Sequence, residues 1–138
     1  MLRLCGALTD GTSTWCVGVD TLRNYTVPTL REAAEEAGRA APRVVCALPI
    51  CVTDDPGAAT ARVSKLTGIY TQLPSYRAMM DREGVADPGG LAIVGSEAEV
   101  RDQLADLAAA GVTDFNASQF PADPDEAVRT RSVLKSFV

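Results

Sequence analysis

The sequence predicts an α/β fold with about three parallel strands and covering helices, and two observations lead to this prediction. Residues 43–53, RVVCALPICVT, form a continuous apolar run, which is typical of a central strand covered on both faces. Helical patterns alternate with such short runs along the chain, as they do in βαβ units that build a parallel sheet. We expect the order αβαβααβα within a single domain that spans residues 1–138.

The first third of the chain predicts a helix, a strand and a second helix. Met1–Leu8 has apolar residues at helical spacing. After a turn at Asp10-Gly11, residues 14–17 are expected to form a short strand. In the helical region that follows, Pro28 favours a short first turn and a main helix that starts near the proline.

Prolines also divide the middle of the chain. Pro49 lacks an N–H, so strand pairing should be interrupted within residues 43–53. Asp55 is the expected N-cap of a long helical segment, which Pro74 should break so that residues 75–83 form a helix of their own.

The closing segment has the clearest local signals. Ser96 and Glu99 form an S-x-x-E capping box, and the helix that they start should end at Gly111. Residues 91–94 are expected to be an extended entry to this helix, and residues 113–117 a strand. Asp123, Pro124 and Glu126 then favour the start of a last helix.

Composition excludes several classes of partner. The net charge is −5 with acids and bases interspersed, so no basic face for nucleic acid is expected. There is no signal peptide and no run of 18 apolar residues, so we expect a cytoplasmic protein without a membrane segment. The chain has four cysteines without C-x-x-C spacing and no histidine, so we expect no metal site and small buried thiols.

Several segments of the sequence, in the order in which the family has them, resemble the luciferase-like monooxygenase superfamily and its branch that uses the deazaflavin coenzyme F420. They cover nearly the whole chain and read MLRLCGALTDGT, VPTLREAAEEAGR, RVVCALPICVTDDP, LPSYRAMMDREG and VGSEAEV…AGVTDFNAS. The resemblance implies a partial (β/α)8 TIM barrel, a C-terminal half-barrel with the sixth, seventh and eighth strands. The N-terminal half of the barrel would be absent, since a closed barrel needs about 250 residues.

The resemblance also implies a function and a cofactor. The expected activity is that of an F420-dependent oxidoreductase, which transfers a hydride between reduced deazaflavin and an organic small molecule. FMN is the alternative cofactor, because no residue of the chain distinguishes the two. The cofactor performs the hydride transfer in such enzymes, so the sequence designates no catalytic residue.

Candidate substrate-binding residues are Trp15, Tyr76 and Arg77. Trp15 ends the first expected strand and would wall a planar ligand, or it packs between strand and helix. By resemblance, the insertion that contains Tyr76 and Arg77 overhangs the mouth of the active site, where the arginine would pair with an anionic group. The alternative for Arg77 is a solvated position on a helix face.

Candidate cofactor-binding residues follow from the location of barrel sites at the carboxyl ends of strands. Gly18, Thr53 and Ser118 lie at or just beyond these ends. Gly95 and Ser96 offer backbone amides at a helix N-terminus, either for an anion or in an ordinary N-cap.

Two kinds of function remain open. The first is an oxidoreductase, or the C-terminal part of one, in which homo-oligomerisation or a separate N-terminal half restores the barrel wall. The second is a truncated, non-catalytic remnant, or a partner subunit that associates through open sheet edges.

Overall fold

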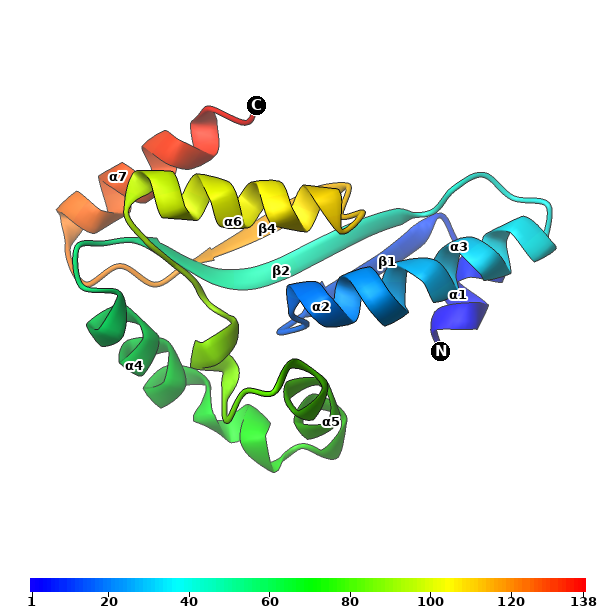
Figure 1. The fold of residues 1–138 in the computed structure, drawn as a ribbon, viewed down its shortest axis with the longest axis horizontal. Coiled ribbons are helices and arrows are strands. Elements are labelled where there is room, and N and C mark those ends of the chain that lie inside the picture. The colour runs from blue at the N-terminus through cyan, green and yellow to red at the C-terminus, as the bar shows by residue number, and fades with distance from the viewer.

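A computed structural model describes residues 1–138, and Figure 1 shows one parallel sheet with its helices. The elements in chain order are α1 (Leu2–Leu8), β1 (Gly11–Trp15), α2 (Val19–Thr21), α3 (Val27–Glu36), β2 (Arg43–Val52), α4 (Pro56–Thr67), α5 (Pro74–Glu83), β3 (Ile93–Gly95), α6 (Glu97–Ala109), β4 (Asp114–Gln119) and α7 (Pro124–Lys135). A π-helical turn (Leu22–Thr26) joins α2 to α3, and 3₁₀ segments (Gly68–Gln72 and Pro88–Leu91) flank α5. The predicted α/β class and parallel sheet are confirmed.

The sheet has four strands, one more than the sequence indicates. Residues 93–95, expected to be part of an extended entry to α6, pair with residues 50–52 of β2 as the short strand β3. The N–H of Thr53 extends this pairing by donating to the carbonyl of Gly95, 2.8 Å away. Three residues are too few to show a strand periodicity in the sequence, and their position beside β2 makes them a strand.

Strand β2 pairs in parallel with all three other strands. Residues 43–47 pair with β1 and residues 45–50 with β4. The backbone groups of Ala47 and Thr53 bond to β1 and β3, whereas those of Val44 and Ile50 bond to β4. Because backbone groups alternate between the two edges of a strand, β1 and β3 share one edge of β2 and β4 occupies the other.

This arrangement explains how β2 accommodates Pro49. The backbone nitrogen of Pro49 faces the edge that β1 and β3 share, at the point where β1 has ended and β3 has not begun. Pairing is therefore interrupted on that edge, as predicted, but it continues through Pro49 and Ser118 on the β4 edge. The proline lies where no partner needs an N–H.

The main helix starts beside Pro28, as predicted: α3 begins at Val27, with Pro28 in its first turn. Residues 19–36 form one continuous helical stretch, in which the π-turn 22–26 leads directly into α3. In that turn the N–H of Val27 bonds to the carbonyl of Leu22, five residues earlier. A π-turn is one of the local adjustments by which a helix accommodates a residue that cannot join the regular hydrogen-bond ladder.

Two strand boundaries also differ from the predictions. Strand β1 spans residues 11–15 instead of 14–17. Gly11 lets β1 come close to β2, because a Cβ at position 11 would lie 2.0 Å from the Arg43 carbonyl oxygen. Cys16 adopts a left-handed φ of 53°, which ends β1. Strand β4 runs to residue 119, two residues beyond the expected end, because β2 is long enough to pair with it there.

The predictions for α4 and α5 are confirmed in outline. Asp55 caps α4, accepting a hydrogen bond from the N–H of Ala58, and Pro74 begins α5. Helix α4 ends at Thr67, earlier than expected, and a 3₁₀ segment leads to the proline.

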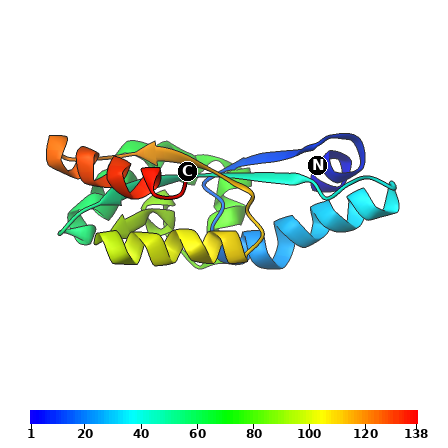
Figure 2. The same ribbon diagram turned by 90° about the horizontal axis from the view of Figure 1, so that it is seen from above.

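The two faces of β2 have different surroundings. Helices α3 and α6 lie along one face, where their apolar residues pack on alternate β2 residues such as Val44, Leu48 and Val52 (Figure 2). The opposite, helix-poor face carries Ala47, Pro49 and Cys51, with Trp15 and Ser118 beside them in register. We call this second face the open face.

Three of the four cysteines are buried and all four are free thiols. None of the helices is both long and apolar enough to cross a lipid bilayer.

Candidate functional site

The carboxyl ends of the four strands lie at one end of the sheet because all pairings are parallel. Trp15, Gly95 and Gln119 are the last residues of β1, β3 and β4, and Thr53 follows β2 directly. Parallel α/β proteins build their sites at this end. Strand β1 nevertheless ends beside Ala47, six residues before Thr53, so Trp15 lies farther down the sheet than Thr53 and Gly95.

An aromatic cluster, formed by Trp15, Tyr70 and Tyr76, stands at the carboxyl end of β1. The rings of Trp15 and Tyr70 meet edge to face, with centroids 6.2 Å apart. Tyr70 also contacts Tyr76, with centroids 4.6 Å apart. The structure therefore joins the predicted residues Trp15 and Tyr76 through Tyr70, which the sequence did not single out because the 3₁₀ segment that carries it has no clear pattern.

Two properties of this cluster bear on its chemistry. The indole Nε1 of Trp15 is buried and has no hydrogen-bond partner, which is rare for a buried donor. Burial, together with Tyr70 and Cys16, raises the pKa of the Tyr76 phenol, so that Tyr76 is neutral at physiological pH. The cluster thus presents aromatic faces and an unpaired N–H donor.

Arg77 does not join the aromatic cluster. Its Nε donates to Asp81 at 2.8 Å, and its terminal nitrogens donate to the carbonyls of Ala86 at 2.9 Å and Val85 at 3.1 Å. The guanidinium thereby binds the loop that follows its own helix.

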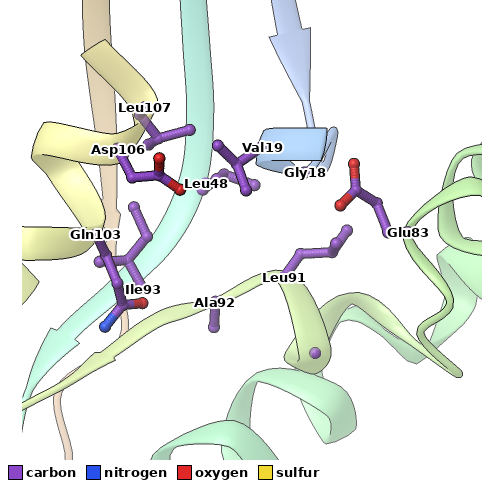
Figure 3. A pocket seen from close by; sticks show the side chains of 11 residues that line it. Gly18, Val19, Leu48, Glu83, Leu91, Ala92, Ile93, Gln103, Asp106 and Leu107 are labelled. Carbon is purple, nitrogen blue, oxygen red and sulfur yellow. The ribbon is translucent and has the colours of Figure 1, made fainter. Parts of the chain in front are cut away.

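Gly18 lines a cavity of about 170 Å³ on the other face of β2 (Figure 3). Leu48, which points to the helix-covered face, forms part of its wall, whereas Trp15 stands on the open face. Gly18 provides space for the Glu83 carboxylate, because a Cβ at position 18 would lie 2.3 Å from its Cδ. Glu83 accepts the N–H of Thr21 at 2.5 Å and so caps the helical stretch that starts there.

Gly95 and Ser96 begin α6, and the predicted capping box is present in full. The N–H of Ser96 donates to Oε2 of Glu99 at 2.8 Å, and the N–H of Glu99 donates to Oγ of Ser96 at 3.4 Å. A second carboxylate, Glu97, lies in the same turn, and its bond from Arg129 lowers its pKa to about 2. Carboxylates of the chain itself therefore occupy this helix N-terminus.

A polar network, formed by Cys51, Thr53, Arg62 and Glu126, lies beyond the end of β2. The Thr53 hydroxyl donates to Oε1 of Glu126 at 2.6 Å, and the Cys51 thiol donates to Oε2 at 3.3 Å. Arg62 lies 3.6 Å from the same carboxylate and donates to the carbonyl of Phe120 at 2.7 Å. Thr53, a predicted site residue, is therefore part of the scaffold.

Burial raises the pKa of Glu126, but hydrogen bonds from Ala122, Thr53 and Cys51 outweigh burial, so that its pKa lies below the ordinary value. From the sequence, Glu126 was expected only to help start the last helix. Its position in the sequence gives no sign that it would bond to Cys51 and Thr53.

Ser118 lies opposite Pro49 on the open face and is half-buried. The neighbouring carboxylates Asp54 and Asp55 have separate partners: Asp55 caps α4, and Asp54 binds Arg129 at 3.0 Å. No cluster of potential ligands for a metal ion occurs in the structure.

Comparison with known families gives one match, to a model described as "Luciferase-like monooxygenase", over residues 1–114. No curated protein matches the sequence.

Solved structures with a similar fold include an F420-dependent secondary alcohol dehydrogenase in complex with an F420-acetone adduct, with 18% identity and a TM-score of 0.76 over 99% of this chain and 46% of that one. The coenzyme F420-dependent tetrahydromethanopterin reductase of Methanopyrus kandleri has 21% identity and a TM-score of 0.73 over 96% of this chain and 46% of that one. The oxygenating constituent of 3,6-diketocamphane monooxygenase from Pseudomonas putida, in complex with FMN, has 19% identity and a TM-score of 0.68 over 96% of this chain and 43% of that one.

At these identities the similarity shows the fold, which is that of part of a (β/α)8 barrel. The chain spans about half the length of these structures, 46% of the first two.

Proposed function

The chain belongs to the luciferase-like monooxygenase family, and on this basis we propose that it forms part of the active site of an F420-dependent oxidoreductase. The reaction would transfer a hydride between reduced deazaflavin and an organic small molecule. Two of the similar structures are F420-dependent enzymes, which favours this cofactor, and one contains FMN, which keeps FMN as the alternative.

The observation that carries this proposal is the aromatic cluster at the carboxyl end of β1. Trp15 and Ser118 stand on the same face of the sheet, and the residues between them in register, Ala47 and Pro49, have small or flat side chains. Ala47 and Pro49 are themselves buried, so a planar ring on this face would contact Trp15 and Ser118, which are both partly exposed.

In this proposal the chain's own residues bind the cofactor and the substrate and orient them. The bound cofactor supplies the ring that carries the hydride. Trp15 with Tyr70 and Tyr76 forms the wall on the substrate side, and Ser118 is the cofactor-binding candidate with a side chain on the open face. Gly18, Thr53, Gly95 and Ser96 act indirectly, because they hold helix starts and loops around the strand ends.

We further propose that association with another polypeptide completes the pocket. The outer edges of β1 and β4 pair with no strand, and the unpaired backbone groups of an edge strand can pair with another chain. Either a second copy of this chain or a separate polypeptide with further strands would supply the opposite wall. The same open edges support the alternative function, a non-catalytic subunit that docks on a related barrel.

A fluorescence titration of the purified chain with F420, and in parallel with FMN, tests the redox proposal. Saturable binding at micromolar concentrations would support it and identify the cofactor. The substitution Tyr25→Phe, far from the open face, is the control, and Trp15→Phe should weaken binding. If a folded chain binds neither cofactor, the proposal for this chain alone is wrong and the subunit function is favoured.

A further inference from the structure

The cavity that Gly18 lines, with a volume of about 170 Å³, is separate from the open face, because it lies on the helix-covered face of β2 (Figure 3). We infer that this cavity is a binding site for a small organic cation, a primary ammonium group on a short hydrocarbon chain. The inference goes beyond the proposed function and does not depend on it.

The position of the cavity follows from the way in which the strands meet. Leu48 of β2, which forms part of its wall, lies between Ala47, where β1 ends, and Ile50, where β3 begins. Residues 18–19, which follow β1, and residues 90–93, which lead into β3, form two further sides, and α6 forms another. The cavity therefore lies at the junction of three strands of the sheet.

Glu83 brings a carboxylate to this cavity without a cation. It is half-buried, and its Oε1 accepts the N–H of Thr21 at 2.5 Å, but none of the ion pairs of the structure includes it. Its other oxygen, Oε2, accepts no hydrogen bond and lies beside Gly18. The neighbouring Arg82 places its guanidinium carbon 4.0 Å from the centroid of the Tyr25 ring. A partly buried carboxylate is costly unless a cation or further donors compensate its charge, so this side of the cavity favours a cationic ligand.

The side of the cavity opposite the end of α5 adds two more acceptors, both on α6 (Figure 3). The Nε2 of Gln103 donates to the carbonyls of Val94 at 3.0 Å and Glu99 at 3.2 Å, which leaves its Oε1 as the atom available to a ligand. Asp106 pairs with Arg23 through Oδ1, and its Oδ2 accepts no hydrogen bond. Every polar side chain around the cavity thus offers an oxygen acceptor, and none offers a free donor.

This arrangement selects the chemical class of the ligand. An anion would face two carboxylates with no cation on the cavity wall. A metal ion lacks its usual set of ligands here, since the structure contains no group of three potential ligand side chains. A hydrocarbon would leave the acceptors unused. An ammonium group has three N–H donors and no acceptor, which matches the three oxygen-bearing side chains.

The rest of the wall and the volume of the cavity set the size of the ligand. Leu48, Ile93 and Leu107 line the cavity and are buried, so a hydrocarbon chain would contact apolar side chains. At roughly 30 Å³ per non-hydrogen atom, the volume that a water molecule takes in the liquid, the cavity holds about five such atoms. Butylamine, which is protonated at neutral pH, has this size.

The experiment follows the cavity by NMR spectroscopy of the intact chain. Proton–nitrogen spectra contain the backbone amides of Gly18 and Ala92 and the side-chain amide of Gln103, all of which line the cavity. The probes are butylamine, butanol and butyrate, which share a four-carbon chain and differ in charge. Each is titrated into the chain until the shifts saturate.

Two variants separate the effect of one carboxylate from that of net charge. Glu83→Gln removes the charge from the cavity, while its amide oxygen can still accept the Thr21 N–H. Asp102→Asn is the matched control, because it removes one negative charge from an exposed position of α6 that does not line the cavity. The proton–nitrogen spectrum of each variant also reports whether it is folded.

We expect butylamine to shift the cavity resonances with a Kd on the order of 1 mM, in keeping with so small a ligand. It should bind on the order of tenfold more tightly than butanol, the ratio given by one charge-assisted hydrogen bond. Butyrate should leave the resonances unchanged. Glu83→Gln should weaken butylamine binding on the order of tenfold, whereas Asp102→Asn should leave it unchanged.

The inference is overturned if butanol or butyrate binds as tightly as butylamine, if the shifts arise away from the cavity, or if no probe binds. Binding of butylamine that survives in Glu83→Gln also overturns it, as does an equal loss in both variants, which would mean that only net charge attracts the amine. If Glu83→Gln does not fold, the comparison of the three probes on the unmodified chain decides. The F420 and FMN titrations concern the open face, so either result can stand without the other.

Discussion

Glu126 is a single carboxylate that holds together the ends of several elements. It accepts hydrogen bonds from Thr53 and Cys51 after and within β2, and from the N–H of Ala122 in the loop after β4 at 2.5 Å. Its side chain is only 13% exposed, and Arg62 of α4 lies beside it. One residue of α7 therefore fixes the two loops that follow β2 and β4.

Replacement of Glu126 by Gln should destabilise the fold by about 1–3 kcal/mol, the cost of leaving buried donors without an acceptor. The amide oxygen can still accept one bond, but the amide nitrogen cannot accept from Cys51 or from Ala122. Chemical denaturation measures the effect, and Asp125→Asn, an exposed neighbour on the same helix, is the control. Equal stability of the two variants would show that the network has no structural role.

Arg129 binds two carboxylates, Asp54 and Glu97, and its bond holds the Glu97 pKa at about 2 against an ordinary value of 4.5. A lowered carboxyl pKa contributes stability that is present above the ordinary pKa and is lost as the pH falls toward 2. Arg129→Gln should therefore lower the melting temperature by a few degrees at neutral pH.

The difference in melting temperature between Arg129→Gln and the unmodified chain should shrink as the pH falls from about 4.5 to about 2. These are the ordinary pKa of Glu97 and its pKa in the folded chain. Thermal melts across this range measure it. Arg131→Gln, an exposed position on the same helix, should show no such dependence. A difference that stays constant with pH would assign the effect to packing of Arg129.

At the scale of elements, the starts of helices could be predicted and the deviations within them could not. The caps at Asp55, Ser96 and Asp123 depend on residues three apart in sequence, so the chain itself specifies them. The short strand β3 forms because it lies beside β2, which is far from it along the chain. Local patterns contain no information on such neighbours.

Ser96→Ala tests the contribution of one predicted cap. The substitution removes the acceptor for the Glu99 N–H at the start of α6, and it should cost about 1 kcal/mol of folding free energy. Ser132→Ala is the control, because Ser132 lies inside α7, where alanine favours helix formation. Urea denaturation of both variants gives the comparison. A Ser96 variant as stable as the control would mean that Glu99 alone supplies the cap.

At the scale of the whole molecule, the aromatic cluster is a product of tertiary structure. Trp15 and Tyr76 were predicted because they follow a strand end and a proline break, but the residue that joins them, Tyr70, lies on an unpredicted 3₁₀ segment. Arg77 was predicted for the site because, by resemblance, the insertion that contains it overhangs the mouth of the active site. Its contacts with Val85 and Ala86 depend on the loop after α5, which sequence spacing does not describe.

The open edge of β4 leads to a prediction about association. The N–H of Phe120 donates to Ile50 of β2, and N–H groups alternate along a strand, so that of Asn116 points toward β2 and that of Ala117 points outward. Ala117→Pro should therefore reduce self-association or binding of a partner while the fold is retained. Light scattering after size-exclusion chromatography measures the mass over a range of concentrations.

Asn116→Pro is the matched control, because it removes a bond between β4 and β2 and should unfold the chain. If the chain is monomeric at every concentration and Ala117→Pro leaves partner binding unchanged, the edge of β4 is not an interface.

The buried thiols have a practical consequence for the study of this chain. Burial raises the pKa of Cys16 to about 12 and those of Cys46 and Cys51 to about 11, so these thiols are neutral as well as covered in the folded state. Cys5 is partly exposed. An alkylating reagent should label Cys5 at once and the other three only when the sheet opens. The rate at which the reagent labels Cys46 therefore measures how often the central strand β2 opens.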